Sequence, residues 1–291
     1  MQTNGAGEGK LVIVPTPLGT LGDMTTRALD ALRDADVVCA EDTRVTGKLL
    51  SIFGIEKRLE RLDEVLIGAR AEGVVERVLA GEVIAYCSDA GMPGVSDPGL
   101  RLVSAARAAG AQVEVLPGPV AAATAYVSSG CTNPRFYFGG FFPRKASEQR
   151  SALAGLRMLD AALIFYESPN RIVDALESVA EAFPLREVAV CRELTKLHEE
   201  VVRGLAPQVR DEFAARAREG AVKGEVAFVI DGPSQAEREV HARDAATGAS
   251  ARAFELLAEG ELSKKDIVKL LCQEFEVSRN EAYDIVMQAD A

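Results

Sequence analysis

Residues 83–99 read VIAYCSDAGMPGVSDPG, and this stretch decides the fold. The apolar run Val83–Cys87 predicts a buried strand, and sequence with helical spacing lies on either side of the stretch. Leu11–Pro15 is a second apolar run, and it also leads into a loop rich in proline and glycine. Apolar strands that alternate with helices are typical of a parallel sheet covered on both faces. We therefore predict an α/β protein.

The same pattern continues along the chain. We expect further strands at 36–40, 113–116, 135–142, 162–166, 187–191 and 222–230, and helices at 25–34, 46–53, 69–80, 99–109, 120–129, 150–158, 172–182, 207–218, 250–260, 263–274 and 279–287. The organisation that follows is a flexible N-terminal tail at 1–10, an α/β domain at 11–118, a second α/β domain at 119–233, a polar linker at 234–248 and a C-terminal helical segment at 249–291.

Composition limits the function classes. The chain has 291 residues, enough for two domains, and a net charge of −11. A protein that coats phosphate backbones is normally basic, so the charge argues against generic nucleic-acid binding but leaves room for local basic patches. Such patches occur at Arg144 and Lys145, at Arg192 and Lys196, and at Lys264, Lys265 and Lys269.

Metal-binding and membrane signals are weak. The five cysteines are far apart and the chain has two histidines, so we predict no metal site. Cys39, Cys87 and Cys191 end apolar runs and are expected to be buried free thiols. The polar start and the lack of a run long enough to span a bilayer predict a cytoplasmic protein.

Two loops are the first candidates for chemistry. The loops at 15–23 and 87–99 each follow a predicted strand, and ligands of parallel sheets lie at the carboxyl ends of strands. Glycines allow close approach of a ligand, and the aspartates of the second loop can accept hydrogen bonds from ribose hydroxyls or an ammonium group. The alternative is structural, because both loops could be stiff turns before a helix.

Charged segments at other strand ends are further candidates. Residues 41–44, Glu-Asp-Thr-Arg, could hold a polar substrate or could equally cap the next helix. In the second domain, residues 165–171, 192–199 and 223–225 stand next to strands. Side chains of these segments could serve proton transfer, although solvated surface charge would explain them as well.

These motifs together resemble the tetrapyrrole-methylase superfamily, and within it the branch that acts on ribosomal RNA. The resemblance covers about residues 11–230 in order and rests on the segments at 14–19, 40–44, 88–91, 96–99, 117–119, 165–169, 192–196 and 223–225. It implies two α/β domains with a cofactor cleft between them. The implied activity is methyl transfer from S-adenosylmethionine to the ribose 2′-oxygen of a cytidine in the decoding region of 16S rRNA, with the rRNA bound within the 30S subunit. The superfamily also implies a homodimer.

The resemblance, together with the chemistry and position of the side chains, suggests roles for individual residues. It implies cofactor contacts from Pro15, Asp89, Gly91, Met92, Pro93, Val95, Ser96, Val120, Ala121, Tyr166, Leu194 and Gly224. Candidates for the catalytic base are Glu41, Asp42, Glu167, Glu193 and Lys196, of which Lys196 would need a lowered pKa. Candidates for RNA contact are Arg44, Arg144, Lys145, Arg192, Lys264 and Lys265.

Three positions depart from the branch pattern. Thr20, Met92 and Asn170 stand where asparagine, threonine and histidine are usual, and residues 61–64 lack the usual His or Asn. Two other functions therefore stay open. One is methylation of a tetrapyrrole or of a modified protein residue, and the other is a non-catalytic protein that binds the cofactor.

Overall fold

The computed structural model describes residues 9–275 and 277–290. These form two compact units. The larger holds the chain as far as Gly155 together with Ala161–Asp231, and the smaller holds Leu156–Asp160 together with the chain from Gly232 onward. The tail expected at 1–10 falls mostly outside the described residues, and Lys10 already belongs to a strand. The domain limits predicted from the sequence stay predictions.

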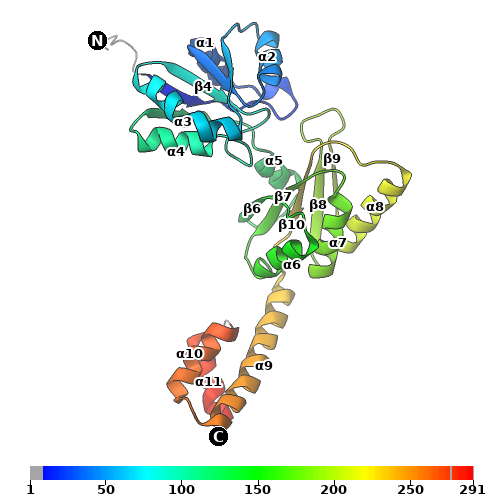
Figure 1. The fold of residues 1–291 in the computed structure, drawn as a ribbon. Helices are drawn as coiled ribbons and strands as arrows, with labels where there is room; N and C mark the ends of the chain where they lie inside the picture. Colours follow the sequence, from blue (N-terminus) through cyan, green and yellow to red (C-terminus); the bar gives the residue numbers. More distant parts are fainter. Residues whose placement is uncertain (1–8, 276, 291) are drawn as a thin grey trace. The chain divides into compact units, whose positions relative to one another are not determined.

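The first half of the larger unit is a parallel sheet with helices on both faces (Figure 1). Its elements are β1 (Lys10–Ile13), η1 (Leu21–Asp23), α1 (Thr26–Asp34), β2 (Val37–Ala40), α2 (Thr43–Ile52), β3 (Leu59–Arg61), α3 (Glu64–Leu79), β4 (Val83–Cys87), α4 (Leu100–Ala108) and β5 (Gln112–Val115). The strands lie in the order β3-β2-β4-β1-β5, and each neighbouring pair is parallel. The predicted parallel α/β architecture is confirmed for this half.

Burial on both faces explains the unbroken apolar strands. In β1, Leu11 and Ile13 pack into the core beneath α3 and α4, whereas Val12 and its neighbour Val14 pack beneath α1 and α2. Tyr86 pairs with both Ile13 of β1 and Cys39 of β2. The three central strands therefore end at the same edge, and the loops that follow them meet there.

Two helices of this half begin earlier than the spacing of apolar residues predicts. Helix α2 begins at Thr43 because the Asp42 side chain accepts a hydrogen bond from the Arg44 N–H, and α3 begins at Glu64 because Asp63 caps it in the same way. Such caps satisfy N–H groups that have no partner within the helix, so polar first turns become helical. The short edge strand β3 was not predicted, because its charged residues carry little strand signal.

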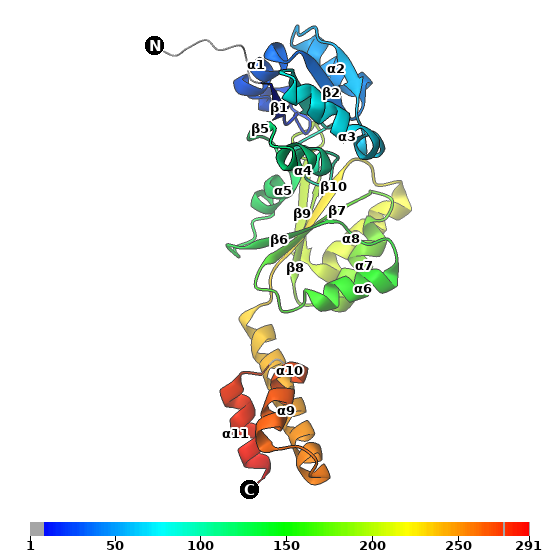
Figure 2. The same cartoon turned by 60° about the vertical axis from the view of Figure 1, so that its left-hand side comes forward.

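The second half of the larger unit has a mixed sheet. Its elements are α5 (Ala121–Ser128), β6 (Phe136–Phe141), α6 (Ala146–Gly155), β7 (Ala162–Glu167), α7 (Ile172–Ala182), β8 (Glu187–Arg192), β9 (Glu200–Leu205), α8 (Ala206–Glu219) and β10 (Val226–Ile230). The strand order is β6-β7-β10-β8-β9, in which only the β6–β7 pair is parallel. Figure 2 shows α6, α7 and α8 on one side of this sheet and α5 on the other. Strand β9 was not predicted, because its exposed residues alternate with partly buried ones.

The smaller unit is helical, as predicted for the C-terminal segment. It contains α9 (Gln235–Glu259), α10 (Lys264–Phe275) and α11 (Arg279–Ala289), which share a core centred on Ala253, Ile267 and Leu271. The segment predicted as a linker, 234–248, is helical from Gln235 onward and forms the first half of α9. Ser234 and Glu237 make a capping box that starts the helix, and a polar composition does not oppose helix formation once a cap is present.

Candidate functional site

The two loops singled out in the sequence are hydrogen-bonded to each other. The Thr16 N–H donates to the Gly91 carbonyl at 2.9 Å, and the Gly91 N–H donates to the Thr16 carbonyl at 3.0 Å. Pro15 packs against the backbone of Gly118, where an added Cβ would lie 2.3 Å from the proline ring. The loops after β1 and β4 are therefore held as one surface at the carboxyl edge of the first sheet.

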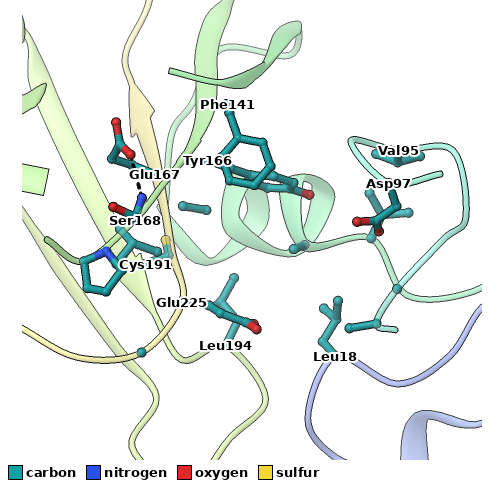
Figure 3. Close-up of a pocket in the computed structure, with 18 of the residues that line it drawn as sticks. Leu18, Val95, Asp97, Phe141, Tyr166, Glu167, Ser168, Cys191, Leu194 and Glu225 are labelled. Atoms are coloured by element: carbon teal, nitrogen blue, oxygen red, sulfur yellow. Dashed lines mark hydrogen bonds between the residues drawn. The ribbon is translucent and has the colours of Figure 1, made fainter. Parts of the chain in front are cut away.

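A cavity of about 360 Å³ opens beside these loops and takes its lining from both halves of the larger unit (Figure 3). The first half contributes Leu18, Ala90, Gly91, Met92, Val95 and Asp97. The second half contributes Val120, Ala121, Phe141, Tyr166, Glu167, Ser168, Pro169, Cys191, Leu194, Gly224, Glu225, Val226 and Ala227. A mainly apolar cavity with a few polar groups is the usual form of a small-molecule site.

An irregularity in β6 shapes the aromatic wall of the cavity. The pairing of β6 with β7 shifts between Phe138 and Phe141, and Gly140 within the shift has a φ of +71°. Phe141 then lies edge-on to Tyr166, with 5.7 Å between ring centroids. The Tyr166 hydroxyl accepts a hydrogen bond from the Ala122 N–H at 2.9 Å, and burial raises the pKa of Tyr166 to about 12. Tyr166 therefore stays a neutral phenol near pH 7.

Acidic side chains gather where the central strands of the first sheet end. Glu41 accepts a hydrogen bond from the Asp89 N–H at 3.3 Å, and Asp89 accepts one from the Asp42 N–H at 3.1 Å. Burial raises the pKa of both Glu41 and Asp89. Asp97 lines the cavity itself, and burial, together with the negative charges of nearby acids, raises its pKa to about 7.

A charged cluster beside the cavity holds the loop after β8 against the start of β10. Lys196 forms ion pairs of 3.0 Å with both Glu193 and Glu225. Glu193 also accepts a hydrogen bond from the Glu225 N–H at 2.8 Å. Burial lowers the pKa of Lys196, but the hydrogen bonds to the two glutamates outweigh it, and the net pKa is raised. The lowered pKa that a lysine base would need is therefore contradicted.

Glu167 is the predicted catalytic candidate that lines the cavity. It is buried, pairs with Arg171 and accepts a hydrogen bond from the Ser168 N–H. Burial raises its pKa. Its second carboxylate oxygen, Oε2, is buried without a hydrogen-bond partner. Glu41, Asp42, Glu193 and Lys196 do not line the cavity. Asp42 caps α2, and its hydrogen bonds to Arg44 hold the pKa of Asp42 well below its usual value.

The predicted cofactor residues divide into two groups. Those that line the cavity are Gly91, Met92, Val95, Val120, Ala121, Tyr166, Leu194 and Gly224. Pro15, Asp89, Pro93 and Ser96 do not line it. Pro15 and Asp89 instead hold neighbouring loops in place. Ser96 has a φ of +63°, a conformation rarely adopted outside glycine, and it directly precedes Asp97.

Several lining residues receive no individual role from the sequence. Asp97, Phe141 and Glu225 are examples. Asp97 is an acid in a Gly- and Pro-rich loop, and that signal was available beside Asp89. Phe141 could not be assigned, because the strand irregularity that turns it is set by packing. Gly139 in the same irregularity lies against the Phe165 ring, and an added Cβ there would be 2.2 Å from it.

The predicted RNA-contacting cations are mostly paired with carboxylates. Arg44 pairs with Asp42, Lys145 with Glu148, Arg192 with Glu200 and Lys264 with Asp290. Arg144 and Lys265 are exposed. Lys264 and Lys265 lie in the smaller unit along a groove between α10 and α11, which also presents Lys269, Arg279 and Tyr283.

Metal-binding clusters and membrane-spanning helices are both absent from residues 9–275 and 277–290. No group of three or more His, Cys, Asp or Glu side chains there is arranged to hold a metal ion. In the same residues, no helix has the length and apolar character needed to cross a bilayer. Cys39, Cys87 and Cys191 are buried free thiols, as expected.

Comparison with known proteins identifies a matching family and several relatives of this chain. The family model of the tetrapyrrole (corrin/porphyrin) methylases matches residues 10–210. The ribosomal RNA small subunit methyltransferase I of Bacillus subtilis strain 168 is 36% identical over 98% of this chain and 96% of its own length. The protein of that name from Halalkalibacterium halodurans is 41% identical over 77% of this chain and 76% of its own length.

Solved structures show the same fold. A diphthine synthase is 18% identical, with a TM-score of 0.59 over 76% of this chain and 90% of that chain. The uroporphyrin-III-C-methyltransferase of Thermus thermophilus is 21% identical, with a TM-score of 0.54 over 77% of this chain and 94% of that chain. At these identities the likeness concerns the fold alone.

Proposed function

The chain belongs to the tetrapyrrole methylase family, within its group of ribosomal RNA small subunit methyltransferases I, and from this we propose that it methylates 16S rRNA. The finer proposal is transfer of a methyl group from S-adenosylmethionine to the ribose 2′-oxygen of a cytidine in the decoding region. The relatives support the substrate class. The observation that carries the proposal is the cavity lined from both halves of the larger unit.

The residues of the cavity fit a sulfonium methyl donor. Its apolar and aromatic lining suits an adenine ring, and backbone at Gly91 and Ala121 can approach a ligand closely. The acids Glu41 and Asp89 make the field at one side of the cavity negative, which favours a cationic ligand. When bound, S-adenosylmethionine supplies an electrophilic methyl group that an oxygen nucleophile can displace from sulfur.

We propose donor contacts from the cavity residues named in the sequence analysis, namely Gly91, Met92, Val95, Val120, Ala121, Tyr166, Leu194 and Gly224. The other four candidates, Pro15, Asp89, Pro93 and Ser96, support these contacts by fixing the loops. Tyr166 ties β7 to the start of α5 through its hydroxyl, so it also fixes Ala121 and Ala122. This chain's own contribution is thus to hold the donor and exclude water around the reacting atoms.

The RNA has to be recognised by a chain of net charge −11. We propose that local patches do this. The first is the exposed Arg144 of the larger unit, whose charge acts on Glu167 of the cavity, and the second is Lys264 and Lys265 in the smaller unit. Arg44 and Arg192 are proposed as weaker contributors, because their carboxylate partners compete with phosphate. A homodimer, binding within the 30S subunit and a cytoplasmic location stay predictions from the resemblance.

The direct test is to map ribose methylation on small-subunit rRNA from cells that lack this chain. We expect one 2′-O-methylcytidine in the decoding region to disappear, and to return when the wild-type chain is supplied from a plasmid. A Gly91→Val chain supplied in the same way is the matched variant and should not restore the methylation. Gly91 has a φ of +77°, and a Cβ added there would lie 3.1 Å from Leu18. An unchanged methylation map in the deletion strain would contradict the proposal.

A further inference from the structure

Asp97 differs from the other acids of the site in having no partner. It lies between β4 and α4, lines the cavity and is only partly exposed. Among the residues that the structure describes, no hydrogen bond or ion pair engages its carboxylate. In Figure 3 that carboxylate points into the cavity, toward the hydroxyl of Tyr166. A half-buried carboxylate without a partner is costly, and such a cost persists where a function requires it.

Each neighbouring carboxylate is already engaged. Glu41 and Asp89 accept backbone hydrogen bonds, and Glu225 pairs with Lys196. Glu167 accepts the Ser168 N–H and pairs with Arg171. An engaged carboxylate is a weaker proton acceptor, because protonation would cost it those bonds. The Oε2 of Glu167 also lacks a partner, but protonation of Glu167 would weaken the bonds that its Oε1 makes. Among the acids that line the cavity in the described residues, Asp97 is therefore the one whose protonation costs no existing bond.

The local backbone aims Asp97 at the cavity. Ser96, directly before it, has a φ of +63°, and Gly94 and Gly99 on either side have φ values of +88° and +137°. An added Cβ at Gly99 would lie 3.2 Å from the Tyr86 ring, so the loop is packed tightly at its base. A left-handed serine in such a loop is strained, and this strain is concentrated at the residue that sets the direction of Asp97.

The charges around Asp97 come from several elements. Glu41 at the end of β2, Asp89 after β4 and Glu225 before β10 all act on it, while Tyr166 of β7 and Tyr86 of β4 are the neutral phenols nearby. Burial and these three acids raise its pKa to about 7. A general base works best when its pKa lies near the working pH, so the surroundings suit proton transfer at neutral pH.

We propose that Asp97 is the general base of the methyl transfer, an inference that rests on the function proposed above. The new bond forms between the acceptor oxygen and the methyl carbon while the methyl–sulfur bond breaks, and sulfur keeps the electron pair. The hydroxyl proton passes to a carboxylate oxygen of Asp97. The negative charge of Asp97 is thereby neutralised in the same step in which the positive charge on sulfur is lost.

The first test is single-turnover methylation of unmodified 30S subunits across pH 5.5–9. For the wild type we expect a rate that rises with pH and levels off above about pH 7. Asp97→Asn should lower the plateau by about 10²- to 10⁴-fold and remove the pH dependence, with donor affinity by calorimetry nearly unchanged. Asp97→Glu should recover part of the rate. Asp34→Asn, on the exposed end of α1, is the control and should match the wild type.

The second readout needs no activity. Carbon-13 NMR of the Asp97 carboxyl in the free chain should titrate with a midpoint near 7, and Glu41→Gln should move the midpoint to lower pH, since it removes a like charge. A midpoint near 4, or an Asp97→Asn chain with full rate, would overturn the proposal. So would loss of donor binding alone, which would make Asp97 a counter-ion of the donor. A wild type that methylates no 30S subunit would instead contradict the proposed function.

Discussion

At Gly224 the backbone has a φ of +92°, and an added Cβ would lie 2.4–2.6 Å from the side chain of Glu193. Glu193 and Thr195, opposite it, are themselves left-handed residues, with φ values of 53° and 65°. The ion pairs of Lys196 with Glu193 and Glu225 hold the two segments together beside this contact. Single residues of unusual conformation thus set the position of the loop between β8 and β9, which places Leu194 in the lining of the cavity.

Asp97 has a cost to stability that depends on pH. Its pKa rises from 3.8 to about 7 on folding, so the folded state binds the proton more tightly than the unfolded state. Stability is therefore lost as pH rises from about 4 to about 7. We expect Asp97→Asn to raise the melting temperature of the larger unit at pH 8 and to leave it unchanged near pH 3.5. Differential scanning calorimetry at both pH values measures this.

Glu82→Gln is the control with the opposite sign. The hydrogen bond from Arg77 lowers the pKa of Glu82, so its contribution is present above the unfolded pKa and is lost on acidification. Glu82→Gln should therefore lower the melting temperature at pH 8 and have little effect well below pH 4. An Asp97→Asn chain that is less stable than the wild type at pH 8 would contradict the burial argument.

At the scale of elements, the irregularity in β6 decides the aromatic wall. Gly139→Ala should be strongly destabilising, since its Cβ would lie 2.2 Å from the Phe165 ring in the core that Phe142 and Phe228 complete. We expect a loss of about 1–3 kcal/mol, as for an overpacked core, together with weaker donor binding because Phe141 is displaced. Urea unfolding and calorimetry with S-adenosylmethionine measure the two effects.

Gly73→Ala is the matched control for that substitution. Gly73 lies inside α3 and has nothing within 4 Å of an added Cβ. The same chemical change should therefore stabilise the protein by about 0.5–1 kcal/mol through helix propensity and leave donor binding unchanged. Equal effects of the two substitutions would show that the β6 irregularity does not control the site.

The central strands and most helices could be predicted from the sequence because burial repeats along them with a clear period. Val83–Cys87 is buried on both faces and reads as an unbroken apolar run. Strand β9 could not be predicted, because it is an edge strand in which partly buried residues alternate with exposed ones. The first half of α9 was taken for a linker, since capping rather than an apolar stripe starts it.

The candidate site was predictable to a similar degree. The motifs of the family resemblance point to Gly91, Val120 and Gly224, and all three line the cavity. Pro15 and Asp89 hold neighbouring loops and do not line the cavity, so their contact with a cofactor stays a prediction. The importance of Asp97 depends on acids brought together from separate elements, which the order of residues does not show.

At the scale of the whole molecule, the chain has a net negative charge, but some of its basic residues are concentrated in local patches. If Lys264 and Lys265 contact phosphate, Lys264→Glu with Lys265→Glu should weaken binding to 30S subunits. The slope of log affinity against log salt should fall by about 2, one for each lost phosphate contact. Filter binding at several salt concentrations measures this. Arg218→Glu, on the exposed end of α8, is the control, and equal losses in both chains would exclude a specific contact.

Transfer of labelled methyl groups from S-adenosylmethionine to purified 30S subunits tests the central claim most directly. The subunits come from cells that lack this chain, and the rRNA is digested to nucleosides after reaction with the full-length protein. Our account predicts about one labelled 2′-O-methylcytidine per 16S rRNA, located in the decoding region. Label on a base, or no label in RNA while a tetrapyrrole precursor becomes methylated, would contradict it.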